Sequence, residues 1–128
     1  MYLLDTNACI DFLDARSEKA MRRIDQEFGR LTVSTITIAE LLVGSKTSLD
    51  PDADRERVTI FVKGVDVAPF DEAAAITYGN VVRSIGVKRN IFDRLIGVQA
   101  LTLGLTLVTS NAKDFANVPG LKVENWAA

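Results

Sequence analysis

At 128 residues and 14.0 kDa the chain has the size of one domain over residues 1–128, and its 48% of apolar residues can form a buried core. Its 15 basic and 17 acidic residues give a net charge of −2, which excludes a globally polycationic surface but not a local basic patch. The absence of histidine excludes Ser-His-Asp and Cys-His catalysis and a conventional zinc hydrolase, so the chemistry must depend on carboxylates, amides, hydroxyls and lysines.

The first half of the chain alternates apolar runs, typical of buried parallel strands, with helical patterns. The apolar runs predict strands at Tyr2 to Leu4 and at Leu31 to Ser34. The first predicted helix is short, capped by Thr6 or Asn7, and reaches Leu13. The others run from a Ser17 cap to Phe28 with Met21, Ile24 and Phe28 inward, from Thr35 to Val43 before Gly44, and from Pro51 towards Lys63 behind an Asp50 cap.

The second half continues the same alternation. It predicts strands at Val65 to Pro69 and Leu105 to Thr109, with a shorter one at Leu121 to Val123. The predicted helices are Glu72 to Ile85, between an Asp71 cap and Gly86, and Phe92 to Leu103, ended by Gly104. Strand–helix alternation with short turns predicts an α/β fold, a three-layer α/β/α domain with a mainly parallel sheet of four to five strands.

The single cysteine, Cys9, excludes an internal disulfide and suggests a reducing compartment. Asp5 interrupts the apolar start, which argues against a signal peptide, and no apolar run approaches the roughly 20 residues that span a bilayer. We therefore expect a cytoplasmic protein that does not enter a membrane.

Three acidic residues, Asp5, Glu40 and Asp93, stand beside apolar segments that should be buried. Each has an ordinary alternative: Asp5 can cap a helix, Glu40 can face solvent, and Asp93 can favour a helix N-terminus. Burying a bare carboxylate costs several kcal/mol or more, so charges in such places usually have a cation or another partner. If the three acids enter one site, they form a pocket for a hard cation such as Mg²⁺ or Mn²⁺.

Four short motifs occur in a recognisable order. They are Leu3-Leu4-Asp5-Thr6-Asn7, Thr37-Ile38-Ala39-Glu40-Leu41, Asp93-Arg94-Leu95-Ile96, and Leu107-Val108-Thr109-Ser110-Asn111 with Asp114-Phe115. In this order and spacing they resemble the PIN-domain ribonucleases, and more narrowly the VapC-like toxins of VapBC type II toxin–antitoxin pairs. The resemblance covers nearly the whole chain, including the closing segment from Pro119 to Trp126, and implies a PIN-like fold.

The resemblance implies a metal-dependent endoribonuclease. The positions matching Asp5, Glu40 and Asp93 would hold Mg²⁺ or Mn²⁺, and a metal-activated water would hydrolyse the RNA phosphodiester bond, leaving 5′-phosphate and 3′-hydroxyl ends. Structured RNAs such as transfer RNA, including initiator tRNA, are the implied substrates. The resemblance also implies a cognate VapB-like antitoxin, a homodimer and a toxin–antitoxin hetero-oligomer. Ile10, Phe12 and Leu13 are candidate contact residues for these partners, with core packing as the ordinary alternative.

Thr6 and Thr109 match hydroxyl positions of the family motifs, where they would orient carboxylates or hold a metal-bound water. Asn111 stands where many relatives carry a fourth acid, so it supplies an amide oxygen without a charge. Asp114 approaches the site if a helical turn begins at Asn111; otherwise it is an exposed loop acid. Gln99, where toxin relatives often have histidine, is assigned no role.

Cations must flank an acidic pocket if a polyanion is to approach it. Arg94, beside Asp93, is the first candidate for a phosphate contact. Solvated helix faces are the alternative for every other cation considered, namely Arg16, Lys19, Arg22, Arg23, Arg30, Lys46, Arg83, Lys88 and Arg89.

Two other functions have similar sequence requirements. A phosphoacceptor receiver module shares the length and the alternation, but it needs neighbouring acids after its first strand and a lysine after its fifth. Asp5 stands alone, and the segment from Asn111 to Lys113 is a poor substitute. The second alternative is a catalytically impaired PIN-like RNA- or protein-binding module. The three acids argue against it, and Asn111 argues for it.

Overall fold

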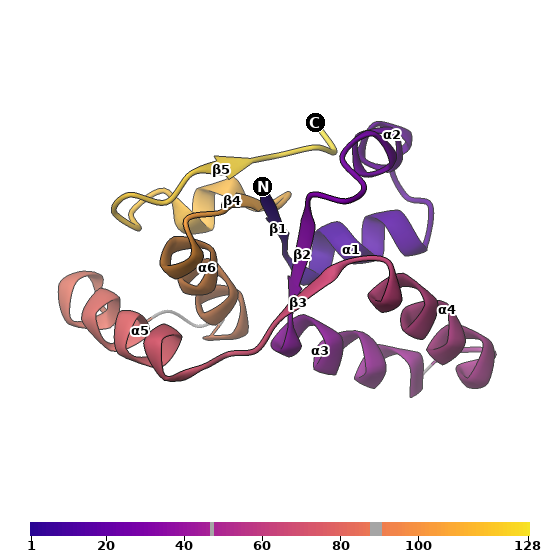
Figure 1. Cartoon of the computed structure of the whole chain (residues 1–128), viewed down its shortest axis with the longest axis horizontal. Helices are drawn as coiled ribbons and strands as arrows, with labels where there is room; N and C mark the ends of the chain where they lie inside the picture. The colour runs from indigo at the N-terminus through magenta and orange to yellow at the C-terminus, as the bar shows by residue number, and fades with distance from the viewer. Residues whose placement is uncertain (47, 88–90) are drawn as a thin grey trace.

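A computed structural model describes residues 1–46, 48–87 and 91–128. Its parallel strands form one five-stranded sheet in the order β3-β2-β1-β4-β5 (Figure 1). The strands are β1 (Tyr2–Leu4), β2 (Leu31–Ser34), β3 (Asp66–Ala68), β4 (Thr106–Val108) and β5 (Val123–Glu124). The predicted parallel sheet is confirmed.

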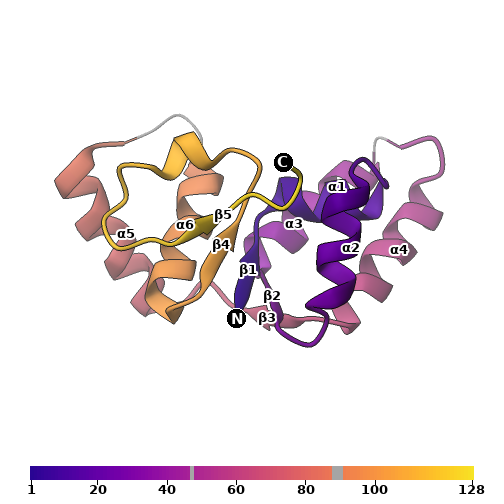
Figure 2. The ribbon, with the colours of Figure 1, turned by 90° about the horizontal axis from the view of Figure 1, so that it is seen from above.

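Helices cover both faces of this sheet, so the predicted three-layer α/β/α arrangement is confirmed. The helices are α1 (Thr6–Leu13), α2 (Glu18–Gln26), α3 (Thr35–Lys46), α4 (Pro51–Lys63), α5 (Glu72–Ile85), α6 (Ile91–Leu103) and the short 3-10 helix η1 (Ala112–Phe115). Figure 2 shows α1 to α4 on one side of the sheet and α5 and α6 on the other. Within the described ranges, no helix is long and apolar enough to cross a membrane.

The strands supply side chains to two hydrophobic clusters, because successive residues of a strand point to opposite faces. Leu4 and Val108 pack with α1, α2, α3 and α4. Their neighbours Leu3 and Leu107 pack with Ile96, Ala100 and Phe115 on the other face. Burial on both faces explains the adjacent apolar residues of β1 and β4, whereas β2 alternates Leu31 and Val33 with the buried polar residues Thr32 and Ser34.

Capping residues define most helix ends. Ser17, Asp50 and Asp71 each accept a hydrogen bond from the backbone N–H three residues later, as predicted. The cap of α1 is Asp5, an alternative that the sequence left open, whereas Thr6 and Asn7 are helical residues and not caps; Asp5 Oδ1 accepts a hydrogen bond of 2.8 Å from the Ala8 N–H.

Two predicted helix ends are wrong. Helix α3 continues through Gly44 to Lys46, since a glycine inside a helix costs only about 1 kcal/mol and the flanking turns remain packed. Helix α2 ends at Gln26, because the chain turns at Gly29, with φ of 100°, to enter β2. Phe28 is therefore 46% exposed instead of facing inward.

The last strand also lies later than predicted, at Val123–Glu124, because Gly120 adopts φ of 78° and keeps the next two residues in the connection. It still pairs in parallel with β4, through Leu107 with Val123 and Val108 with Glu124.

The direction of chain winding reverses between β1 and β4. Strands β1, β2 and β3 follow one another outward, whereas β4 and β5 lie on the other side of β1. In open parallel sheets, a crevice that binds ligands forms beyond the carboxyl ends of the strands at such a reversal. Asp5 directly follows β1 and Thr109 directly follows β4, so both lie at the mouth of this crevice.

Candidate functional site

Asp5 is the most buried acid of the site, with a side chain 1% exposed. Its N–H donates to the Val108 carbonyl at 3.0 Å, and its carboxylate accepts hydrogen bonds from the Ala8 N–H and the Thr109 side chain. Burial raises the pKa of Asp5 to about 6; the two hydrogen bonds oppose the rise, and the negative charges of Asp93 and Asp11 add to it. Asp5 is thus a helix cap whose ionised form is disfavoured by burial.

Glu40 reaches the same crevice from α3. The Thr6 hydroxyl donates a 2.6 Å hydrogen bond to Glu40 Oε1, and the Thr37 hydroxyl lies 3.2 Å from Thr6 Oγ1. Glu40 is half-buried, so one side of its carboxylate is fixed by the protein. The first residue of α1 therefore orients an acid on α3.

Asp93 lies in the first turn of α6 and is half-buried. Its pKa is raised by burial first, then by the charge of Glu40 and that of Asp114. An open cavity of about 570 Å³ is lined by Thr6, Asn7, Ile10, Glu40, Ile91, Phe92 and Asp93. The structure therefore brings Asp5, Glu40 and Asp93 into one electrostatically coupled group.

This group has the right chemistry for a hard divalent cation. Among the described residues, no three acidic or cysteine side chains are already close enough to chelate one ion together. The charge of Asp93 nevertheless adds to the raised pKa of Asp5, and the charge of Glu40 adds to that of Asp93; a cation between the carboxylates would remove this repulsion. Carboxylate and hydroxyl oxygens are ligands that Mg²⁺ and Mn²⁺ accept. The donor set thus fits such an ion.

The end of β4 supplies the remaining polar groups. Thr109 Oγ1 accepts a 3.0 Å hydrogen bond from the Asn111 N–H in addition to its contact with Asp5. Asn111 itself is exposed at the start of η1. The helical turn expected after Asn111 is present as η1, so the condition for Asp114 to approach the site is met. Asp114 is half-buried, and its charge adds to the raised pKa of Asp93.

Asp11 was not among the residues singled out from the sequence, yet its charge raises the pKa of Asp5. It lies on α1 and lines a narrow crevice with Thr109 and Ser110. The only sequence signal was its position on the helix that Asp5 caps, and many surface acids share that property.

Arg94 is almost completely buried, at 2% exposed, and its Nη1 and Nη2 atoms have no hydrogen-bond partner. A phosphate contact by Arg94 stays a prediction, and it requires the guanidinium to become accessible. Gln99 is buried too, with its Nε2 donating to the Ala68 carbonyl at 3.2 Å. Lys88 and Arg89 lie outside the described residues.

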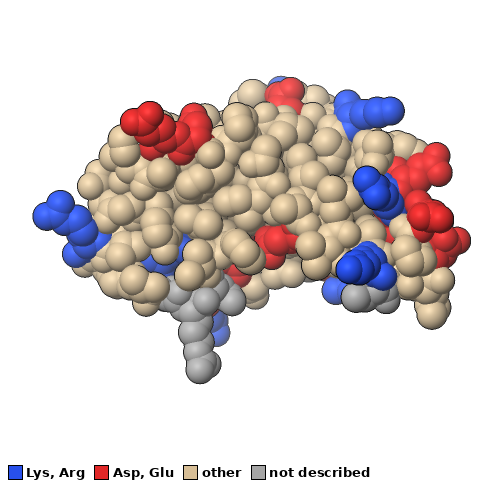
Figure 3. Space-filling model, turned by 90° about the horizontal axis from the view of Figure 1, so that it is seen from below, with Lys and Arg blue, Asp and Glu red and all other residues tan. Residues whose placement is uncertain are grey.

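Charged side chains are unevenly distributed on the face seen from below. Basic and acidic groups alternate at the end formed by α4, whereas the middle of this face is mostly uncharged apart from a small acidic patch (Figure 3). On α4, the cations Arg55, Arg57 and Lys63 are accompanied by three acids, namely Asp52, Asp54 and Glu56, and the helix is capped by a further acid, Asp50. This end of the molecule therefore carries no excess of positive charge.

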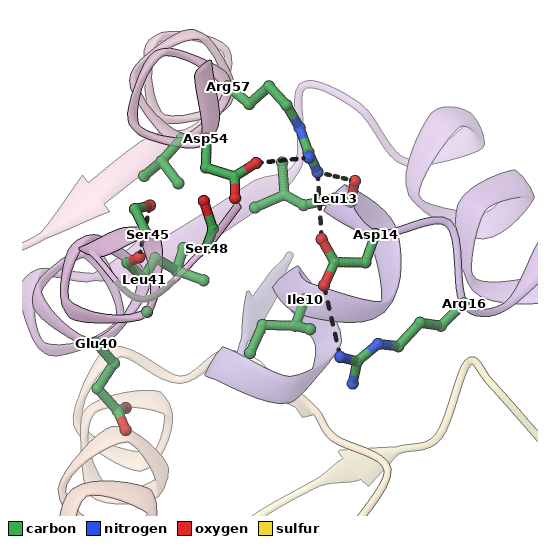
Figure 4. Close-up of a pocket in the computed structure, with 12 residues that line it drawn as sticks. Ile10, Leu13, Asp14, Arg16, Glu40, Leu41, Ser45, Ser48, Asp54 and Arg57 are labelled. Carbon is green, nitrogen blue, oxygen red and sulfur yellow. Dashed lines mark hydrogen bonds and ion pairs between the residues drawn. The ribbon is translucent and has the colours of Figure 1, made fainter. Parts of the chain in front are cut away.

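A second hollow, of about 230 Å³, lies between α1, α3 and α4 and has Glu40 at its edge (Figure 4). Ile10, Leu13 and Leu41 line its apolar part. Arg57 crosses its rim, donating to the Leu13 carbonyl, to Asp14 at 3.3 Å and to Asp54 at 3.0 Å. Ile10, Phe12 and Leu13 also pack against the core, so core packing explains part of their apolar character.

Comparison with known proteins gives consistent results. The family model of the PIN domain matches residues 2–121. The chain is 31% identical to the tRNA(fMet)-specific endonuclease VapC of Salmonella typhimurium, over 98% of this chain and 97% of that protein. The DNA-bound VapBC structure from Salmonella typhimurium matches with a TM-score of 0.89 and 31% identity, covering 98% and 97% of the two chains. VapBC2 of Rickettsia felis, bound to a promoter DNA fragment, matches with a TM-score of 0.86 and 26% identity over 98% of each chain.

Proposed function

This chain belongs to the PIN-domain family, and we propose that it is the toxin of a type II toxin–antitoxin pair, an endoribonuclease inhibited by a VapB-like antitoxin. The observation that carries the proposal is the coupling of Asp5, Glu40 and Asp93 at the reversal point of the sheet. Full-length similarity to a VapC endonuclease and to chains of VapBC structures supports it.

Asp5, Glu40 and Asp93 would hold Mg²⁺ or Mn²⁺. When bound, the cation activates a water molecule and stabilises negative charge on the scissile phosphate. Asp5 is held rigidly by the Ala8 N–H and by Thr109, which leaves its remaining lone pairs for the ion. Thr6 orients Glu40 in the same way. At the pH of a cell Asp5 is mostly ionised even with a pKa of about 6, so it can act as a ligand.

The remaining polar groups of the site have supporting roles. Thr109 orients Asp5, and the exposed Asn111 can bind a water molecule or a phosphate oxygen without adding charge. The lack of a fourth carboxylate at Asn111 favours one tightly held ion over two. For Arg94 we propose a contact with a phosphate of the substrate.

The substrate we propose is structured RNA, with tRNA first, because tRNA(fMet) appears in the name of a full-length relative. This substrate places the reaction in the cytoplasm. The VapBC structures support a hetero-oligomer with an antitoxin. We also propose that the toxin forms a homodimer.

The decisive experiment compares induced expression of the wild type with that of Asp93→Asn and Asp5→Ala, with growth recorded and RNA ends mapped. We expect growth arrest and new 5′-phosphate ends only with the wild type. Equal arrest and unchanged RNA in all three strains would refute the nuclease function. Purified protein should lose cleavage in EDTA and regain it with Mg²⁺ or Mn²⁺, whereas cutting that persists without a divalent cation would refute the mechanism.

Asn111 supports one alternative, a catalytically impaired PIN-like module that only binds RNA or protein. The same experiment separates the two functions. A module of this kind would bind RNA or antitoxin but leave RNA intact, and Asn111→Asp would then be the variant expected to restore cleavage.

A further inference from the structure

Helix α2 and the segment that follows β5 enclose a cleft that none of the site residues enters. The α2 cleft, of about 450 Å³, is lined by Lys19, Arg22 and Arg23 from the helix and by Glu124, Asn125 and Trp126 from the other side. Figure 2 shows the chain leaving β5 and crossing to the side of the molecule where α1 and α2 lie. The cleft therefore lies on the α1 side of the crevice described above.

Positive charge is concentrated around this cleft. Residues 16–30 contain five basic and three acidic residues, whereas the rest of the chain contains ten basic and fourteen acidic residues, out of 15 and 17 in all. An anion is thus attracted to the surroundings of α2 and repelled by the remainder of a protein whose net charge is −2.

Arg23 lines the cleft and is held by several contacts. Its guanidinium lies 4.9 Å from the Trp126 ring centre and 5.9 Å from that of Tyr2. It also pairs with Glu27 at 3.5 Å and with Glu124 at 3.4 Å. Arg23 is consequently fixed and largely neutralised, so it shapes the cleft more than it attracts a ligand.

Lys19 and Arg22 have weaker attachments. Lys19 Nζ donates to the Ala128 carbonyl at 3.4 Å. Arg22 pairs with Glu18 at 3.4 Å, but the two side chains are 72% and 88% exposed, and an ion pair so exposed is worth little in water. Both cations can therefore exchange these contacts for a phosphate at small cost.

The α2 cleft adjoins a narrow crevice that reaches Thr109, a hydrogen-bond partner of Asp5. Asn125 and Trp126 line the cleft and also line the narrow crevice that contains Thr109 and Ser110. Thr109 contacts Asp5, while Ser110 and Asn125 are exposed and uncharged. An RNA backbone that passes over Ser110 and Asn125 meets two carboxylates, Asp11 at the edge of the crevice and Glu124 in the cleft, and Glu124 is already paired with Arg23.

We propose that the α2 cleft binds the RNA backbone on one side of the scissile phosphate, with Lys19 and Arg22 as the phosphate contacts. The inference rests on the proposed ribonuclease function, because RNA is the polyanion that must reach Asp5. The cations of the α2 cleft would supply the affinity for RNA that the acidic pocket cannot supply, because carboxylates repel phosphates.

The test uses the double variant Lys19→Gln/Arg22→Gln and the matched control Arg55→Gln/Lys63→Gln, which removes two exposed cations from α4. Fluorescence anisotropy with a labelled tRNA anticodon stem-loop is measured in EDTA across a salt series. We expect the α2 variant to lose affinity on the order of tenfold and its salt slope to fall by about 1 to 2, with the control near wild type. In cleavage assays the loss should raise KM.

Equal effects of the two double variants, or no effect of either, would overturn the inference. So would an α2 variant that binds RNA normally but has lost affinity for the antitoxin, since the cations would then serve an acidic protein. Binding in EDTA does not depend on cleavage. A wild type that binds through α2 but cuts nothing would refute the proposed function alone, and one that cuts normally without Lys19 and Arg22 would refute this inference alone.

Discussion

Thr6 Oγ1 donates a 2.6 Å hydrogen bond to Glu40 Oε1, although the two residues are 34 positions apart. The bond links the first residue of α1 to the middle of α3, and it fixes one oxygen of a carboxylate that faces the cavity. Orienting groups of this kind are nearly as important to a metal site as the ligands themselves.

Replacing Thr6 by valine removes this bond while keeping the shape of the side chain. We expect Thr6→Val to weaken Mn²⁺ binding by about ten- to a hundredfold, as for other residues that orient metal ligands. Isothermal titration calorimetry with Mn²⁺ measures the effect. Thr6→Ser retains the hydroxyl and should bind nearly as well as the wild type; equal affinities in the valine and serine variants would show that the bond is unimportant.

The raised pKa of Asp5 makes the metal-free protein sensitive to pH. Folding raises this pKa from 3.8 to about 6, so the folded state binds more protons than the unfolded state between these values. Below about pH 4 Asp5 is protonated in both states and does not lower the free energy of unfolding. As the pH rises through 6, ionisation of the buried carboxyl group lowers the free energy of unfolding by an amount on the order of 3 kcal/mol. The raised pKa of Asp93 acts in the same direction.

Asp5→Asn should remove this cost and keep the helix cap, because asparagine also caps helices well. Urea denaturation in EDTA should show the variant more stable than the wild type by about 2 to 3 kcal/mol at pH 7.5, and nearly equal at pH 4. A gain that is the same at both pH values would contradict this explanation.

Arg94 holds a buried positive charge whose Nη1 and Nη2 atoms have no hydrogen-bond partner. Arg94→Met keeps the length of the side chain and removes the charge, so we expect the free energy of unfolding to rise by about 1 to 4 kcal/mol. The exposed Arg83→Met is the control and should change it by less than about 0.5 kcal/mol. A loss of stability in Arg94→Met would mean that the guanidinium has a stabilising partner, and a raised KM for RNA would support the predicted phosphate contact.

Gly97 permits the close packing of η1 on α6. A Cβ atom at this position would lie 2.8 Å from Phe115 Cε1 and 3.0 Å from Cδ1, inside a buried cluster. Gly97→Ala should therefore lower the free energy of unfolding by about 1 to 3 kcal/mol. Gly79→Ala on α5 has nothing within 4 Å of its Cβ and should raise it by up to about 1 kcal/mol. Chemical denaturation of both variants checks the contrast.

The fold could be predicted well because its signals are local. Apolar runs, caps such as Ser17 and Asp71, and the C-terminal glycines Gly86 and Gly104 each depend on a few neighbouring residues. The errors occur where a distant contact decides. Phe28 is directed out of the core by a turn at Gly29, and no periodicity along α2 contains that information.

The site was predictable in composition but not in geometry. For Asp5 the sequence left capping and site formation as alternatives, and in the structure one carboxylate has both environments. Neither the effect of Asp11 on Asp5 nor the burial of Arg94 could be predicted, because both depend on which helices meet in space.

The reversal of winding between β1 and β4 also determines when the site can exist during synthesis. Asp5 is hydrogen-bonded to Val108 and Thr109, and its charged neighbour Asp93 lies in α6, the helix directly before β4. A growing chain on the ribosome carries Asp5 long before it carries any of these residues, and a domain generally folds as a unit. The site therefore cannot assemble before the chain has been made as far as Thr109.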